Sequence, residues 1–380
     1  MAAGLALALT SAACSDSGGT ADAEGTTTTT AAAAPAPDES LAPPDEPGPY
    51  VVGRTTLQLD DADRGRPLVA DVWYPADAGT TGTPSVYQFL PGIEYDSATA
   101  LADVPVSAAG PFPLVIYSHG SGGLRYISAY FTELLASHGF VVAAVDHVGN
   151  TAVDLIGGAE PPRDQMGLTR VLDVEFLISQ MLSLSAAPSG QFSGTVDADR
   201  VGVTGHSFGG YAALGAVSGV TNSAGSVPAD DRIIAAATMA GWTENLSDEE
   251  LSAVEVPTLL VSGTKDETTP IAANTDRPWE LIPGRPLWRV DLDGAGHQSF
   301  TDVCTYQQLL PGVGAPQALL DIVDDYALEG CGPGLAPIER TQALSNRNMV
   351  AFLLAHVAGA TDYEAFLAQE VPGEAVQVKE

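Results

Sequence analysis

The sequence predicts an α/β protein with a mostly parallel central sheet that helices cover on both faces. Short apolar runs alternate with longer segments whose apolar residues recur at helical spacing. This alternation is typical of parallel strands joined by helical crossovers. After a hairpin of strands at 55–59 and 68–74, buried strands are expected at 114–117, 140–145, 201–204, 233–239, 257–262 and 287–292, the last of these ending the sheet. Helices are expected around 130–135, at 168–184 and at 348–357, which closes the fold. Residues 77–110 and 148–167 are expected to be irregular loops.

Composition limits the classes of partner. The chain has 380 residues, of which 45% are hydrophobic and 17% charged, so it can bury a sizeable core. Its net charge of −33 excludes nucleic acid as an expected partner, because phosphates are bound by lysine and arginine. The same charge disfavours adsorption to an anionic membrane surface. No run of about 18 apolar residues occurs, so no membrane-spanning helix is expected.

The N-terminal region predicts export. Residues 1–14 form a short apolar signal-like segment, and the stretch before Cys14 resembles a bacterial lipobox, in which lipid is attached to the cysteine. An ordinary disordered terminus is the alternative. Residues 15–48 are rich in Ser, Gly, Thr, Ala, Pro and acidic residues and are expected to be a disordered tether. Residues 49–380 are expected to form one catalytic domain of a cell-surface lipoprotein or a secreted protein, and a monomer.

The segment Gly205-His206-Ser207-Phe208-Gly209 fits the pattern G-x-S-x-G. An apolar, β-branched run precedes it, and small helix-forming residues follow it. Strand, tight turn and helix are the context of the nucleophile elbow of α/β-hydrolases. The small flanking residues are needed because bulky side chains would collide with the strand or the helix. Ser207 is therefore the predicted nucleophile, and the fold is predicted to be the α/β-hydrolase fold.

A serine nucleophile needs a base and an orienting carboxylate, which follow it in the order acid, then histidine, in this fold. Of the two histidines after Ser207, His297 lies in a glycine-rich loop beyond a strand, whereas His356 lies inside the last helix. Asp266 follows the strand at 257–262, where an acid can reach the histidine. Glu244 and Asp248 are the alternatives for the acid.

Two further groups of residues are expected at the site. The Phe208 amide and an amide of the loop after the first buried strand, assigned to Ser121, are predicted to form the oxyanion hole. Tyr126 and Trp242 are predicted to bind substrate as an apolar wall with Phe208. His119, His138, His147 and His206 are expected to be structural. They lack the spacing of a metal site, so neither metal nor other cofactor is expected.

Four segments closely resemble the platelet-activating-factor acetylhydrolase group. They are 113–120, 137–147, Gly205 to Gly210, and His297-Gln298-Ser299-Phe300-Thr301-Asp302. The resemblance implies metal-free hydrolysis of esters of short or modified acyl chains. In that group an Asp-Ala-Trp segment carries the acid, whereas this chain has Ala240-Gly241-Trp242. The segment that begins at Asp266 instead resembles cutinase-like polyester hydrolases and dienelactone-hydrolase relatives.

The expected activity is hydrolysis of short-chain acyl esters, whether small molecules or lipids, through an acyl-enzyme. A polyester hydrolase, an acyltransferase and, more remotely, an inactive binding lipoprotein are the alternatives. The acyl length and the alcohol group of the natural substrate stay open. Cys304 and Cys331 are predicted to form a disulfide, because both lie in the folded domain and an exported protein meets oxidising conditions.

Overall fold

The structure, a computed structural model, describes residues 40–158 and 160–380. Cys14 and most of the predicted tether lie outside the described residues. Within that part of the chain, no helix combines the length and apolar character needed to span a membrane.

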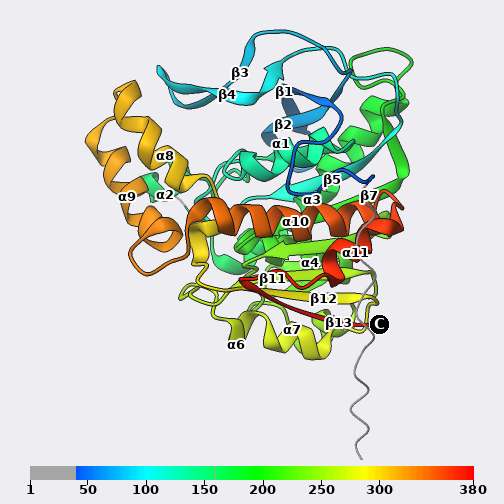
Figure 1. The fold of residues 1–380 in the computed structure, drawn as a ribbon, viewed down its shortest axis with the longest axis vertical. Helices are drawn as coiled ribbons and strands as arrows, with labels where there is room; N and C mark the ends of the chain where they lie inside the picture. Colours follow the sequence, from blue (N-terminus) through cyan, green and yellow to red (C-terminus); the bar gives the residue numbers. More distant parts are fainter. Residues whose placement is uncertain (1–39, 159) are drawn as a thin grey trace, which may run out of the picture. The chain divides into compact units, whose positions relative to one another are not determined.

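The described residues contain one large sheet and a small hairpin (Figure 1). The strands of the large sheet are β1 (Val51–Asp61), β2 (Arg66–Ala76), β3 (Pro84–Leu90), β4 (Ile93–Ala102), β5 (Phe112–Ser118), β6 (Val141–Val145), β7 (Val196–His206), β10 (Ile233–Met239), β11 (Thr258–Gly263), β12 (Leu287–Leu292) and β13 (Glu374–Lys379). The hairpin pairs β8 (Val220–Asn222) with β9 (Gly225–Val227).

Helices connect and cover these strands. The α-helices are α1 (Ala129–Ser137), α2 (Ala152–Gly157), α3 (Arg163–Ala186), α4 (Phe208–Ser218), α5 (Asp248–Ser252), α6 (Ile271–Asn274), α7 (Asp276–Leu281), α8 (Val303–Leu309), α9 (Gln317–Cys331), α10 (Ile338–His356) and α11 (Glu364–Ala368). Short 3₁₀-helices are η1 (His297–Phe300), η2 (Leu310–Val313) and η3 (Thr361–Tyr363).

The order of the large sheet is β13-β12-β11-β10-β7-β5-β6-β2-β1-β4-β3. The six strands from β12 to β6 run parallel to one another, while β13 and β2 join their two edges in antiparallel pairing. Alternate residues of β5 face opposite layers: Leu114 and Ile116 pack with α3 and α4, whereas Val115 and Tyr117 pack with α1 and α10. The predicted fold class, a mostly parallel sheet with helices on both faces, is confirmed.

The predicted loop at 77–110 is wrong, because β3 and β4 form a hairpin there. Apolar and polar residues do not separate onto the two faces of β3: Ser85 is buried, whereas Val86 and Leu90 are exposed, which hides the usual apolar alternation of a strand. The Glu133 carboxylate on α1 accepts hydrogen bonds from Ser97 and Thr99 on β4 and from Tyr87 on β3. Hydrogen bonds to the Glu133 carboxylate therefore make part of the contact between the hairpin and α1, and such bonds leave no apolar pattern in the sequence.

Three other element predictions also differ from the structure. The expected loop at 148–167 contains α2, which starts at a capping box of Thr151 and Asp154, and the first residues of α3. Neither 287–292 nor 348–357 is the last element of its kind, because β13 pairs with β12 and α11 follows α10. β13 is an edge strand in which no residue is buried, so its sequence lacks the run of apolar residues that marks a buried strand.

Residues 40–48, which the sequence assigned to the tether, pack on the domain. Leu41 contacts the cluster beneath α10, and the Tyr363 hydroxyl donates to the Ala42 carbonyl. The Gly48 amide donates to the Ser137 hydroxyl at 2.8 Å. The expectation of a disordered tether is therefore wrong for these nine residues, whose backbone finds partners that composition does not reveal.

The predicted disulfide between Cys304 and Cys331 is present. It joins α8 to the end of α9, the pair of helices at the left in Figure 1. Beside it, the Ser299 hydroxyl of η1 donates to the Gly330 carbonyl at 2.8 Å. The covalent bond therefore ties α9 to the segment that begins at His297.

Replacing both Cys304 and Cys331 with serine is expected to lower the free energy of unfolding by about 3 kcal/mol, because the bond closes a loop of 27 residues in the unfolded chain. Urea unfolding of the oxidised protein and of the double variant measures the difference. Equal unfolding midpoints, or two free thiols by mass spectrometry of the non-reduced protein, would contradict this expectation.

Candidate active site

Ser207 lies at the turn between β7 and α4 with φ 54° and ψ −120°. A positive φ is costly for a residue with a side chain and needs support from its surroundings. Tight backbone packing supplies it. A Cβ on Gly209 would lie 1.9 Å from the Ser118 carbonyl oxygen, and one on Gly205 would lie 2.3 Å from the Gly209 carbonyl oxygen. Only glycine fits at these two positions, so the G-x-S-x-G pattern has a direct steric cause.

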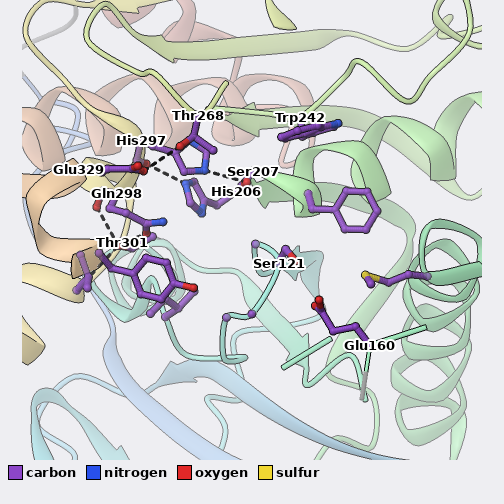
Figure 2. Close-up of a pocket in the computed structure, with 18 of the residues that line it drawn as sticks. Ser121, Glu160, His206, Ser207, Trp242, Thr268, His297, Gln298, Thr301 and Glu329 are labelled. Carbon is purple, nitrogen blue, oxygen red and sulfur yellow. Dashed lines mark hydrogen bonds between the residues drawn. The ribbon is translucent and has the colours of Figure 1, made fainter. Parts of the chain in front are cut away.

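His297 and Asp266 follow the carboxyl ends of β12 and β11, on the same sheet edge as Ser207. His297 Nε2 lies 2.9 Å from Ser207 Oγ (Figure 2). His297 Nδ1 lies 2.8 Å from Asp266 Oδ2. All three side chains are at most 7% exposed. The structure thus brings together the three residues that the sequence predicted as nucleophile, base and acid.

The Asp266 carboxylate is held by the turn that it starts. Its Oδ1 accepts from the amides of Thr268 at 2.9 Å and Thr269 at 2.6 Å, and its Oδ2 accepts from the Thr269 hydroxyl at 2.6 Å. Burial alone would raise the pKa of Asp266, but the hydrogen bonds and charge of His297 and the bonds from Thr269 outweigh it and lower the pKa. The carboxylate is therefore ionised at neutral pH and faces the imidazole.

Thr269 is a site residue that the sequence analysis missed. Its hydroxyl lies between Asp266 and the Ala240 carbonyl, and 3.2 Å from His297 Nδ1. An aspartate with threonines two and three residues later is typical of a turn in which the carboxylate accepts backbone amides, and that signal could have pointed to Thr269. The alternative acids lie elsewhere: Asp248 pairs with Arg277, and Glu244 accepts from Asn274.

The glycine-rich loop after β5 lies directly against the nucleophile. A Cβ on Gly120 would be 3.2 Å from the Ser207 Cβ, and both Gly120 and Ser121 line the same cavity as Ser207. The Ser121 hydroxyl accepts from the Asn150 side chain at 2.9 Å. Phe208 is the first residue of α4, and the first-turn amides of a helix have no partner within the helix. The Phe208 amide therefore has no partner within α4, and Ser121 lies at the wall of the cavity that Ser207 lines.

A cavity of about 560 Å³ opens over Ser207 and His297. Trp242 and Phe208 line it, as expected, and Figure 2 shows Trp242 and Ser121 at its wall. The Trp242 indole N–H donates to Asn245, and the Arg163 guanidinium lies 4.8 Å from the Trp242 ring centre. Glu160 and Glu329 add carboxylates to an otherwise mixed lining.

The predicted substrate-binding role of Tyr126 is wrong. Its side chain is 1% exposed and does not line the cavity. The β3 strand covers it: the Tyr126 hydroxyl donates to the Gln88 carbonyl at 2.6 Å, and its ring packs on Tyr87 and Phe89. The error follows from the missed hairpin, because an irregular loop would have left Tyr126 open to the site.

Of the remaining histidines, His119, His138, His147 and His206 make structural hydrogen bonds, whereas His356 packs on an aromatic ring. His206 Nε2 lies 3.0 Å from the His297 carbonyl oxygen, and burial together with the charge of His297 lowers the pKa of His206 to about 3. His138 bonds the Glu46 carbonyl, and His356 packs on Phe352 in α10. His119 and His147 lie beneath the glycine-rich loop.

His147 belongs to a second serine–histidine–aspartate arrangement. Its Nε2 lies 2.8 Å from Ser118 Oγ, and its Nδ1 lies 3.0 Å from Asp173 Oδ2. These three side chains are at most 1% exposed, and Ser118 ends a strand rather than occupying a strained turn. Burial lowers the pKa of His147 to about 4. We assign this set a structural role, because substrate has no access to it.

The sequence of the chain is similar to those of several known proteins. The bovine (Bos taurus) platelet-activating factor acetylhydrolase is 24% identical over an alignment that spans 83% of this chain and 78% of that protein. The dog (Canis lupus familiaris) protein of the same name is 23% identical and covers 67% of each chain. Cutinase est1 of Thermobifida alba is 27% identical over 169 residues, 44% of this chain and 47% of that protein.

A family model described as PET hydrolase-like matches residues 104–306, more than half of the chain. The matched range begins before β5 and ends within α8, so it includes Ser207, Asp266 and His297. With the sheet order and the elbow already established, the predicted α/β-hydrolase fold and the predicted enzyme class are both confirmed. The chain belongs to the PET hydrolase-like family and is a carboxylic ester hydrolase.

Proposed function

We propose that the protein hydrolyses short-chain carboxylic esters through an acyl-enzyme intermediate on Ser207. The observation that carries this proposal is the continuous hydrogen-bonded chain from Ser207 through His297 to Asp266, at 2.9 and 2.8 Å, beside an accessible cavity. A serine hydroxyl becomes a competent nucleophile only when a base takes its proton, and this arrangement supplies both the base and its orienting carboxylate.

In the proposed acylation step, Ser207 Oγ attacks the ester carbonyl carbon while His297 Nε2 takes the hydroxyl proton. Asp266 accepts the hydrogen bond from Nδ1–H, which holds the tautomer with a free lone pair on Nε2 and stabilises the imidazolium that forms. The amides of Ser121 and Phe208 donate to the oxyanion. The tetrahedral intermediate then collapses, and His297 gives its proton to the departing alcohol.

Deacylation repeats the same steps with water as the nucleophile. His297 takes a proton from water, the hydroxide adds to the acyl carbon, and the oxyanion again lies between the two amides. Collapse breaks the bond to Ser207 Oγ, which recovers its proton from His297, and the free acid leaves. An alcohol in place of water would make the same machinery an acyltransferase, so acid release is part of the test of this proposal.

A second candidate substrate class is a polyester. The PET hydrolase-like match and the cutinase relatives favour it, and the segment that begins at Asp266 resembles that branch. The acetylhydrolase relatives favour a short acyl group on a lipid instead. A panel of p-nitrophenyl esters, an acetylated ether phospholipid and a polyester film separates the two classes by the rate of acid release.

We also propose that the enzyme is exported and tethered through a lipidated Cys14. The Cys304–Cys331 bond supports an oxidising compartment, whereas the tether is supported by the lipobox-like sequence alone. Metabolic labelling with a palmitate analogue, compared between the protein and Cys14→Ala, tests the lipid attachment.

Ser207→Ala is expected to remove covalent labelling by a fluorophosphonate probe and nearly all esterase activity, because the attacking oxygen is lost. Ser118→Ala is the matched control, since Ser118 also contacts a histidine but lies buried, and it is expected to keep the label. Gel fluorescence and peptide mapping measure both. Labelling that persists in Ser207→Ala would refute the assignment of Ser207 as the nucleophile. An absence of labelling in the unaltered protein would favour the alternative hypothesis of an inactive binding lipoprotein.

A graded pair of variants tests the acid. Asp266→Asn is expected to lower kcat by about 10⁴-fold, because an amide favours the wrong histidine tautomer. Thr269→Val removes one hydrogen bond to the carboxylate but leaves its charge, so a fall of about tenfold is expected. Steady-state kinetics on p-nitrophenyl acetate decides. A wild-type rate in Asp266→Asn would direct the search to Glu244.

The catalytic efficiency is expected to fall as the acyl chain of the ester becomes longer than butyrate. Each further methylene gains about 0.8 kcal/mol only when it is buried, and the cavity carries polar and charged side chains beside its aromatic ones. We expect kcat/KM to peak between acetate and butyrate esters and to fall toward palmitate. A profile that rises through palmitate, or a jump in rate above the critical micelle concentration, would contradict the short-chain preference.

A further inference from the structure

A buried arginine lies behind the glycine-rich loop. Arg170, on α3, is 0% exposed, and its guanidinium reaches the carbonyl oxygens of His119 at 2.5 Å and Gly120 at 3.0 Å. Two more of its N–H groups bond the Asn150 side-chain oxygen, at 2.8 and 2.6 Å, and one lies 3.4 Å from Ser118 Oγ. Every acceptor among these is a neutral oxygen, so no carboxylate directly balances the charge.

Such a cation is expensive to bury. Burial lowers the pKa of Arg170 to about 9, which still leaves the guanidinium charged at neutral pH. The acid nearest in sequence, Asp173, is engaged by His147, Arg64 and Arg66. A buried charge without a direct counter-ion carries a desolvation cost that no ion pair offsets, which favours a task for it at this position. The contacts of Arg170 indicate what that task is.

The Gly120 carbonyl oxygen receives three donors. They are the Arg170 guanidinium at 3.0 Å, His119 Nδ1 at 2.7 Å and the Gly123 amide at 3.1 Å. A carbonyl oxygen has two lone pairs, so this one is saturated, and one of its donors is charged. Donors on a peptide oxygen increase the positive charge on the N–H of the same peptide group.

The N–H of that peptide group belongs to Ser121. In a planar trans peptide the C=O and N–H bonds point in opposite directions. Fixing the Gly120 oxygen toward Arg170 therefore directs the Ser121 N–H away from Arg170, and Ser121 lines the same cavity as Ser207. The same guanidinium lies 5.1 Å from the ring centre of Phe208, whose amide is the other proposed donor.

We propose that Arg170 is a positioning residue for the oxyanion hole: it fixes and polarises the Gly120–Ser121 peptide, so that the Ser121 amide stabilises the oxyanion more strongly. This role rests on the proposed function, because it requires an oxyanion beside Ser207. Asn150 supports the same loop from the other side, through its bond to Ser121 and by accepting Arg170. The positive charge behind the loop also favours the negative charge that develops in front of it.

A merely structural role predicts a different result, and the chain offers a matched control. Arg347 on α10 is also buried, at 9% exposure, and it bonds the Phe366 carbonyl and the Gln369 side-chain oxygen. Its guanidinium lies 5.1 Å from the Phe366 ring centre. Arg347 does not line the cavity. Replacing it imposes the same kind of packing loss away from Ser207.

The experiment compares Arg170→Met and Arg170→Lys with Arg347→Met and Arg347→Lys. Each protein is acylated with a slowly hydrolysed ester that carries a ¹³C-labelled carbonyl, and infrared difference spectroscopy measures the acyl-enzyme carbonyl stretch. Kinetics on p-nitrophenyl butyrate gives kcat and KM, and thermal unfolding reports stability.

We expect Arg170→Met to raise the carbonyl stretching frequency and to lower kcat by about 10- to 100-fold, less than the 10²–10³ that removal of a whole donor costs. KM should change little, because acylation and deacylation pass through similar oxyanions and slow together. Arg170→Lys keeps the charge without the planar fork, so its stretch and kcat should lie between those of Arg170→Met and the unaltered protein. The Arg347 variants should lose stability while keeping both values.

A wild-type stretch and kcat in Arg170→Met would overturn the role of Arg170. So would equal changes in the Arg347 variants, or a change confined to KM. If Arg170→Met does not fold, the carbonyl stretching frequency and kcat of Arg170→Lys test the role of Arg170 instead. Failure of the unaltered protein to become acylated on Ser207 would overturn the proposed function itself, and with it this role. Acylation of all variants with one unchanged stretch would overturn only the role of Arg170.

Discussion

Residue 209 has to be glycine, because a Cβ there would lie 1.9 Å from the Ser118 carbonyl oxygen. This contact between the start of α4 and the end of β5 lets the elbow turn tightly enough to place Ser207 at a positive φ. It also sets Ser207 beside the loop that follows β5. The nucleophile, both proposed oxyanion donors and the approach of His297 all depend on that one close packing of backbone.

The buried histidines beneath the site are neutral, whereas the buried Arg170 is charged. Burial lowers the pKa of His119, His147 and His206, so these three rings are neutral hydrogen-bonding groups. Arg170 lies among them and remains charged. The direct hydrogen-bond acceptors of Arg170 are all neutral, and a buried cation acts strongly on the peptide it contacts because its surroundings screen it less than water would.

The predicted site residues that the structure brings together are those tied to backbone constraints. Ser207 follows from two glycines and a strand-to-helix change, and His297 and Asp266 follow from their places after parallel strands. Thr269 and Arg170 were missed because their roles depend on which oxygen they reach. Tyr126 was misplaced because the β3–β4 hairpin, held in part by Glu133, shows little apolar alternation.

The sequence by itself determined the alternation of the parallel strands with their helices, the elbow and the residue types of the site, but not the β3–β4 hairpin or β13, because apolar periodicity and glycine sterics act over a few neighbouring residues. Only the tertiary structure decided which of these residues meet. His297 lies 90 residues from Ser207, and Arg170 lies 50 residues from Gly120. Contacts at such separations arise from the register and packing of the whole sheet. The local sequence around Arg170 therefore does not show that its side chain reaches the Gly120 carbonyl.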